Sequence, residues 1–364
     1  MPNWDLSPVE GAFGEAAVDS GGWKRALETV VSITESHGAL LLPVKGGVLR
    51  TLPFTDSMSG SFDSFIRDGW HLRDERNRGL PLMQRSGVVD DLDIFSPETI
   101  ASHPYYQEFL APHRLCWFAG VGIFFDDDMW CLSIQRRVDQ SPFSTAEKRE
   151  LAKLSRSLAT AAATARILGE AASSGALEAF AASGTAAVLV DRYGKIFEAN
   201  ASAEHLLSGD IRLKEGKLIH GREGSFPNLD RALSRILNQA KAGLHAPVLL
   251  PRKDRAPLLA YPSRLQRTVG NALADCQAMI IFVDPDARRN PTEATLRSVY
   301  KLSGAEARLA INLSTGEALD KVAERLNISK ETSRTQLKSI FAKLGVHRQA
   351  ELVAVLSTLL SGIA

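Results

Sequence analysis

The chain has 364 residues, which is too long for one ordinary hydrophobic core, so we expect two or three domains. Its composition, with 45% hydrophobic and 23% charged residues, is that of a soluble globular protein. A formal net charge of +1 excludes a chain that binds nucleic acid through its overall charge, so a positive surface has to be local.

Helix and strand patterns follow one another over the first 143 residues. Apolar spacing and capping signals predict three helices, over residues 23–37, over 62–72 and from 97 onward. Short apolar runs predict two antiparallel hairpins, 39–44 with 48–52 and 117–125 with 129–136. Together these elements indicate an α+β module with a long loop-and-helix excursion between its strands.

This arrangement resembles a GAF domain, and the resemblance implies an α/β sensor fold over residues 1–143 that holds a small ligand beneath the excursion. Five aromatic side chains are candidates for lining such a pocket: Trp70, Tyr105, Tyr106, Trp117 and Trp130. The alternative is that these side chains are simply part of the core, where aromatic residues are more often found.

Three cysteines, Cys116, Cys131 and Cys276, match no metal-binding spacing and lie among apolar residues, so we expect buried free thiols. Alternatively, Cys116 and Cys131 face each other across paired strands as a redox sensor. The N-terminus lacks the basic flank and apolar core of a signal peptide. No apolar stretch approaches the roughly 20 residues of a membrane span, so we expect a cytoplasmic protein with no membrane partner.

A long helix is predicted over residues 144–175. Ser144 and Glu147 have capping-box spacing at its start, and 173–175 is a Ser-Ser-Gly stop. Its apolar positions recur in steps of three and four, which favours a parallel coiled coil that connects two domains. The dimer seam would include Leu151, Leu154, Leu158 and Leu168. The alternative is a helix that lies on its own domain.

The pattern changes after residue 176. Strands are expected over 186–191, 196–199, 247–250, 258–264 and 274–283, with a helix over 229–242. The positions of Asp191, Gly194, Asn200 and Ala203 resemble the start of a PAS domain, which implies an α/β fold over 176–285 that holds a ligand or a dimer partner. Residues 286–301 would form a linker.

Near the C-terminus, Lys330, Arg334 and Lys338 are four residues apart, so they share one face of a helix that Ser329 caps and Gly345 ends. The simplest interpretation is a solvated surface helix. However, a capped helix from residue 303 and a short helix over 319–326 precede it, and only 327–329 separate the short helix from the basic one. This spacing is typical of a helix-turn-helix.

Residues 302–353 resemble the DNA-binding domain of LuxR/NarL-type regulators, which implies an all-α four-helix domain over 302–364. The resemblance implies base contacts from Arg334, Thr335 and Lys338, and phosphate contacts from Thr332 and Lys343. Ser333 replaces the usual Val, and Gln336 the usual His. The full candidate DNA-binding set is Ser329, Lys330, Thr332, Ser333, Arg334, Thr335, Gln336, Lys338, Ser339 and Lys343. The last helix offers a second dimer surface through Leu352, Val355, Leu356 and Leu359.

The sequence contains no phosphate-binding loop, nucleophile elbow or His-Glu-x-x-His motif, so we expect no catalytic residues, no metal site and no fixed cofactor. The resulting hypothesis is a multidomain α+β, dimeric, one-component transcription regulator that binds double-stranded DNA and responds to a small-molecule or protein signal. The alternative is a module that binds RNA polymerase or another protein without an operator of its own. A small-molecule-binding enzyme is a third and weaker class.

Overall fold

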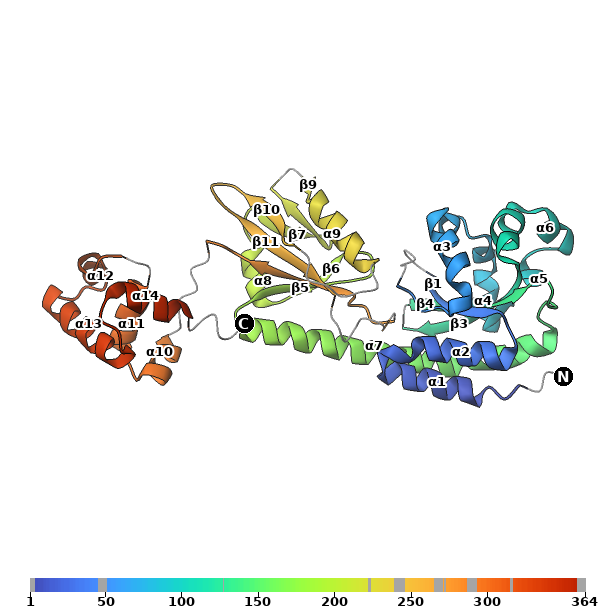
Figure 1. Ribbon diagram of the computed structural model, residues 1–364, viewed down its shortest axis with the longest axis horizontal. Helices are drawn as coiled ribbons and strands as arrows, with labels where there is room; N and C mark the ends of the chain where they lie inside the picture. Colours follow the sequence, from blue (N-terminus) through green and yellow to red (C-terminus); the bar gives the residue numbers. More distant parts are fainter. Residues whose placement is uncertain are drawn as a thin grey trace. The chain divides into compact units, whose positions relative to one another are not determined.

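Figure 1 shows the computed structural model of the chain. It describes residues 4–44, 51–126, 128–221, 224–238, 246–264, 271, 273–286, 293–314 and 317–358. The chain combines helices with several antiparallel sheets and forms two compact units, residues 1–253 with 258–283 and residues 254–257 with 284–364. Within the described ranges, no helix is long and apolar enough to cross a membrane.

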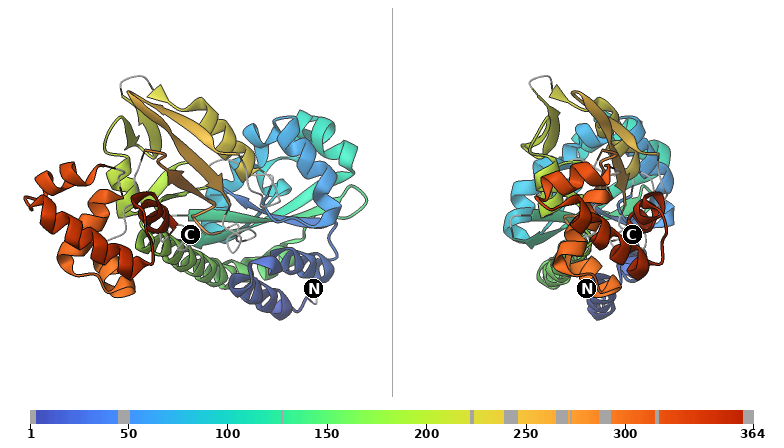
Figure 2. Two further views of the ribbon diagram at one scale, coloured as in Figure 1. Left: turned by 60° about the vertical axis from the view of Figure 1, so that its left-hand side comes forward. Right: turned by 90° about the vertical axis from the view of Figure 1, so that its left-hand side faces the viewer.

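The first part of unit 1, which we call the N-terminal module, contains a four-stranded antiparallel sheet in the order β1-β4-β3-β2. Its strands are β1 (Gly38–Pro43), β2 (Val88–Asp90), β3 (Leu115–Phe125) and β4 (Asp128–Arg137). In Figures 1 and 2, α1 (Ser7–Val18) and α2 (Trp23–Thr34) lie with the start of α7 on one face of this sheet. The excursion of α3 (Ser59–Arg67), α4 (Leu80–Ser86), α5 (Asp91–Ile94) and α6 (Pro97–Ser102) covers the other face.

The predicted helix over 23–37 and the hairpin of β3 with β4 are confirmed. The predicted partner of β1, residues 48–52, lies partly outside the described residues, and its last two residues form a turn. Instead, β1 pairs with β4, with Leu41 opposite Leu132. Apolar runs show that strands exist but not which strands pair over long distances, so the sequence did not reveal this partner.

Helix α7 (Thr145–Ala182) begins at the predicted capping box, where the Ser144 hydroxyl and the Glu147 carboxylate cap each other's backbone N–H groups. It continues past the predicted stop, and the Ser173 hydroxyl donates to the carbonyl of Gly169 at 3.0 Å inside the helix. Such a bond satisfies the hydroxyl without ending the helix.

The predicted coiled-coil seam is wrong for its first three leucines. Leu151, Leu154 and Leu158 are at most 1% exposed and belong to the core of their own chain, where α7 packs on β3 and α1. The alternative, a helix that lies on its own domain, therefore holds for this part of α7. Leu168 is 44% exposed, and its role in a dimer stays a prediction.

The remainder of unit 1, the middle module, has a five-stranded antiparallel sheet in the order β10-β11-β12-β5-β6. Its strands are β5 (Ala186–Val190), β6 (Ile196–Ala199), β10 (Val248–Arg252), β11 (Arg255–Ser263) and β12 (Ala278–Val283). Asn200 caps α8 (Ala201–Leu206), and the predicted amphipathic helix is α9 (Pro227–Leu237). A small sheet of β7 (Ile211–Lys214), β8 (Lys217–His220) and β9 (Gly224–Ser225) was not predicted, because its strands are short and mostly exposed.

Unit 2 is helical from residue 293 onward. Its helices are α10 (Glu293–Tyr300), α11 (Gly304–Leu313), α12 (Leu319–Arg325), α13 (Lys330–Leu344) and α14 (Gln349–Thr358). The predicted linker is therefore wrong in part, because α10 lies within it and buries Leu296 in the same core as Leu309, Val322 and Ile340.

The second predicted dimer surface is also wrong for two of its residues. Leu352 and Leu356 on α14 are at most 1% exposed because they pack into the core of unit 2. Val355 packs against that core while it stays partly exposed. Leu359 lies outside the described residues.

Candidate nucleic-acid interface and internal cavity

Helix α13 is fixed at both ends by local sequence. The Ser329 hydroxyl accepts a hydrogen bond from the Thr332 N–H at 3.0 Å, and Gly345 ends the helix in the left-handed conformation with φ of 68°. Ile340 is fully buried, while Leu337 and Phe341 pack against the core of unit 2. These apolar side chains therefore attach α13 to its neighbours.

An exposed face of α13, beside the apolar one, presents the predicted base-contacting residues to solvent. Arg334, Thr335 and Lys338 are all exposed. The Thr335 hydroxyl donates to the carbonyl of Glu331 at 3.0 Å. Over the described part of the chain, no side chain forms an ion pair with Arg334 or Lys338. Both cations are thus available to a ligand.

Three further residues of the candidate set are exposed, and Gln336 is half-buried. Ser329 and Thr332 share a hydrogen bond between their hydroxyls at 2.7 Å, so both belong to the cap as well as to the surface. Lys330 forms an exposed ion pair with Asp320 at 3.0 Å. An exposed pair of this kind contributes little stability and can exchange for a phosphate contact.

The prediction that Ser333 belongs to the DNA-binding set is wrong. Its side chain is fully buried, and its hydroxyl donates to the carbonyl of Lys330 at 2.9 Å within the same helix. A buried side chain that faces the protein core cannot contact DNA.

Ser339 and Lys343 both bond to Glu306 of the same unit. The Ser339 hydroxyl and the Lys343 ammonium group each donate to the Glu306 carboxylate at 2.6 Å. Although burial raises the pKa of Glu306, the hydrogen bonds from Lys343, Ser339 and Ser303 lower it to about 2. Glu306 also completes the capping box of Ser303 at the start of α11, and no sequence signal marks its second role beside α13.

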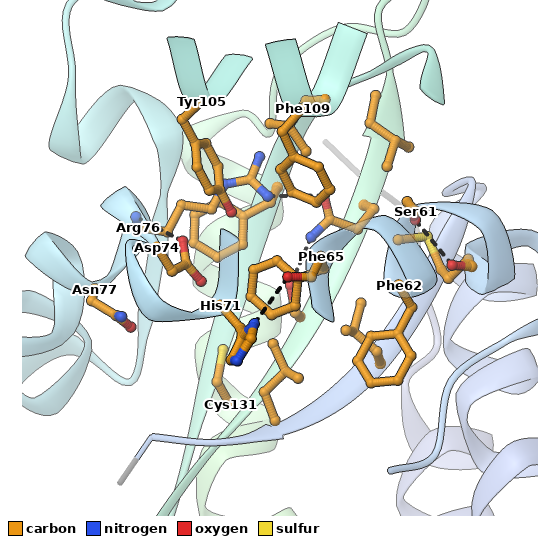
Figure 3. Close-up of a pocket in the computed structure, with 18 of the residues that line it drawn as sticks. Ser61, Phe62, Phe65, His71, Asp74, Arg76, Asn77, Tyr105, Phe109 and Cys131 are labelled. Carbon is orange, nitrogen blue, oxygen red and sulfur yellow. Dashed lines mark hydrogen bonds between the residues drawn. The ribbon is translucent and has the colours of Figure 1, made fainter. Parts of the chain in front are cut away.

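A cavity of about 120 Å³ lies in the N-terminal module, between the sheet and the excursion. Figure 3 shows Asp74, Asn77 and Arg76 on one side of it, Ser61 and Phe62 on the opposite side, and Phe65 and His71 between them. Side chains of β4 that point to this face, Cys131, Ser133 and Gln135, complete the polar part of the wall.

The guanidinium group of Arg76 is buried in the wall and fully engaged. It donates to the Asp91 carboxylate at 2.9 and 3.2 Å, to the Gln135 side chain at 3.1 Å and to the Cys116 carbonyl at 3.3 Å. Burial alone would lower the pKa of Arg76, but the Asp91 carboxylate raises it above its ordinary value. The buried pair is therefore a structural ion pair that fixes one wall of the cavity.

Of the five predicted pocket aromatics, Tyr105 lines the cavity. Trp70 stacks on Phe109 behind the described lining, with ring centroids 5.6 Å apart. The Tyr106 hydroxyl donates to Asp91 at 2.6 Å instead of facing the cavity. Trp117 also lies outside the described lining.

The prediction is wrong for Trp130, because successive strand residues point to opposite faces of a sheet. Cys131 on β4 faces the cavity, so Trp130 faces the other side, where it is fully buried and its indole donates to Asp128 at 3.0 Å. The pairing of β3 with β4 is also inconsistent with the redox-sensor alternative, in which Cys116 and Cys131 face each other. Cys131 lies opposite Gly122 and not opposite Cys116. Among the described residues, no group of acidic, histidine or cysteine side chains is arranged to hold a metal ion.

No protein-family model matches the chain, and no curated protein sequence matches it. Among solved structures, the phage VqmA-DPO complex is 13% identical, with a match that covers 54% of this chain and 91% of that chain at a TM-score of 0.24. The E. coli DhaR(N)-DhaL complex is 14% identical, with coverage of 76% and 87% and a TM-score of 0.25. TM-scores this low establish no shared fold.

Proposed function

We propose that this chain is a one-component, sequence-specific DNA-binding transcription regulator whose activity is set by a signal that the N-terminal and middle modules sense. The observation that carries the proposal is the outer face of α13. Arg334, Thr335 and Lys338 share that face, are exposed, and belong to a helix whose other face is buried in unit 2.

This geometry suits a double helix. An α-helix fits the DNA major groove, where Arg makes bidentate hydrogen bonds to guanine and Lys contacts bases or phosphates. Only residues 326–329 separate α12 from α13 along the chain, which is the spacing of a helix-turn-helix whose second helix is the recognition helix. DNA recognition requires that α13 be held in a fixed orientation. Glu306 holds this helix through its bonds to Ser339 and Lys343.

The two modules of unit 1 support a sensing role. The N-terminal module has the sheet, excursion and cavity expected of a GAF-like domain. The middle module has the turn and capped helix expected of a PAS-like domain: the Asp191 carboxylate accepts from the Tyr193 and Lys195 N–H groups at 2.8 Å, and Gly194 has φ of 77°. The signal in this proposal is a small molecule or a protein. The proposal assigns no catalytic role.

A recognition helix of this size makes few base contacts, so two copies on two half-sites give useful affinity. We therefore include a homodimer in the proposal. With Leu151, Leu154 and Leu158 buried, the large apolar side chains that α7 exposes are Ile167, at 60%, and Leu168, at 44%.

The proposal is tested by selection of DNA from a random duplex pool with the full-length protein, followed by sequencing of the bound fraction. We expect enrichment of one palindromic motif, and loss of that enrichment in Arg334→Ala. Recovery of unenriched DNA would contradict the proposal. Binding of purified RNA polymerase in the same preparation, without enriched DNA, would favour the alternative function.

A further inference from the structure

The wall of the cavity contains a carboxyl group, that of Asp74, with no ion-pair partner among the described residues. Asp74 is half-buried and lines the cavity, where one of its carboxylate oxygens accepts a hydrogen bond from the backbone N–H of Arg76 at 3.0 Å. Among the residues that the structure describes, no lysine, arginine or histidine side chain forms an ion pair with Asp74. The adjacent carboxylate, Glu75, pairs with Arg78 at 2.8 Å.

Arg76 does not neutralise Asp74, because its own charge is already matched. Its guanidinium forms the two-point ion pair with Asp91, at 2.9 and 3.2 Å. When both carboxyl groups are ionised, Asp74, Asp91 and Arg76 together carry one net negative charge. Burial raises the pKa of Asp74, while Arg76 and the Tyr105 hydroxyl lower it in part. A carboxylate beside a low-dielectric space is costly to keep ionised without a cation nearby.

The rest of the wall is rich in aromatic rings. Phe62 and Phe65 come from α3, and Tyr105 and Phe109 come from the π-helical segment Tyr105–Leu110. Aromatic faces attract cations, most strongly where water is excluded. One ring of the same wall, that of Phe118, already contacts a cation: the Arg76 guanidinium carbon lies 4.2 Å from its centroid.

We propose that this cavity binds a small organic cation, with Asp74 as its counter-charge and the surrounding aromatic rings as its apolar contacts. A protonated amine or a quaternary ammonium group on a compact apolar body has this chemistry. An apolar cavity of roughly 150 Å³ holds a benzene molecule, so a cavity of about 120 Å³ suits a ligand no larger than a monocyclic amine. Asn77 lines the cavity and is exposed to solvent.

This inference names the chemical class of the signal in the proposed function. The ligand's role as a signal rests on that function, whereas its binding to the cavity does not. The binding experiment uses no DNA. A failure of cation binding and a failure of DNA binding are therefore separate results.

The test is isothermal titration calorimetry of the full-length protein near neutral pH with tetramethylammonium, benzylamine and phenethylamine. Benzyl alcohol and benzoate serve as the neutral and anionic counterparts of benzylamine. The variants are Asp74→Asn, which keeps the shape of the side chain, and Asp68→Asn as a matched control. Asp68 lies in the same module, 43% exposed and paired with Arg67, so its loss removes one negative charge outside the cavity.

We expect at least one cation to bind the wild-type protein and Asp68→Asn equally, and to bind Asp74→Asn at least about tenfold more weakly. Benzyl alcohol is expected to bind more weakly than benzylamine, and benzoate not at all. Three results would overturn the proposal: no binding by any of the three cations, equal affinity for benzylamine and its uncharged counterpart, or unchanged affinity in Asp74→Asn. The comparison of charged and uncharged ligands on the wild-type protein remains decisive if Asp74→Asn does not fold.

Discussion

The ammonium group of Lys343 donates to the carboxylate of Glu306 at 2.6 Å and thereby joins the last turns of α13 to the first turn of α11. Glu306 simultaneously accepts from the Ser303 N–H at 2.6 Å, so one carboxylate completes a helix cap and holds a second helix. Because Ser339 binds the same carboxylate, the rotation of α13 about its axis is fixed. That rotation determines which residues face outward.

We expect Glu306→Gln to destabilise unit 2 by roughly 1–3 kcal/mol at neutral pH, because it removes the charge that accepts from Lys343. The folded-state pKa of Glu306, about 2, lies below its ordinary value of 4.5, so this stability is present above the ordinary pKa and is lost as pH falls toward the folded value. The difference between wild type and Glu306→Gln should therefore shrink between about pH 5 and pH 2.

All five tryptophans lie in the N-terminal module, so amide hydrogen exchange of α11 and α13 in the full chain is the suitable measurement. Glu324→Gln, at an exposed position on α12, is the control. Equal protection of α13 in wild type and Glu306→Gln at neutral pH would show that Glu306 does not hold this helix.

Ser333→Ala is expected to leave DNA affinity within about 0.5 kcal/mol of wild type, because the side chain is buried and bonded to its own helix. Lys338→Ala, one turn or so further along the exposed face, should weaken binding clearly. Fluorescence anisotropy with the selected duplex measures both. A loss in Ser333→Ala as large as that in Lys338→Ala would place Ser333 at the DNA.

The double substitution Leu154→Asp and Leu158→Asp is expected to unfold the N-terminal module rather than to separate a dimer. Both leucines are at most 1% exposed in their own chain, and two buried, unpaired carboxylates cost more than about 4 kcal/mol together. Urea unfolding followed by tryptophan fluorescence measures the effect. Ile167→Asp, 60% exposed on the same helix, is the control. A stably folded monomer after the double substitution would restore the coiled-coil interpretation.

Arg76→Met is expected to cost about 3–5 kcal/mol, because it leaves the Asp91 carboxylate buried without its cation. Adding Asp91→Asn should recover part of that loss. The same urea experiment measures both, with Arg67→Met as a control, since Arg67 forms an exposed pair with Asp68. If Arg76→Met and Arg67→Met had equal effects, the buried ion pair would not support the cavity wall.

Local signals in the sequence predicted local structure well. The capping boxes at Ser144 and Ser303 and the cap at Ser329 mark three helix starts correctly, because a cap depends on residues within one turn. The helical period also placed Arg334 and Lys338 on one exposed face.

Long-range relationships were not predictable from these patterns. The apolar positions of α7 do recur in steps of three and four. Such spacing does not show whether Leu154 faces a partner chain or the sheet of its own chain. Likewise, Arg76 and Asp91 are 15 residues apart and no motif links them, so the ion pair in the cavity wall was not predicted. The pocket aromatics were predicted from residue type alone. In the structure, Trp130 lies on the opposite face of the sheet because successive strand residues alternate between faces.

The measurement that most directly tests DNA recognition by α13 is the affinity of wild type and Arg334→Ala for the selected duplex and for random duplex, at one salt concentration. Arg231→Ala, which removes one arginine from α9 in unit 1, is the matched control. We expect Arg334→Ala to weaken specific binding by roughly 1–3 kcal/mol and to relax one base position, with little change on random DNA. Equal weakening on both duplexes, or none on either, would contradict sequence recognition by α13.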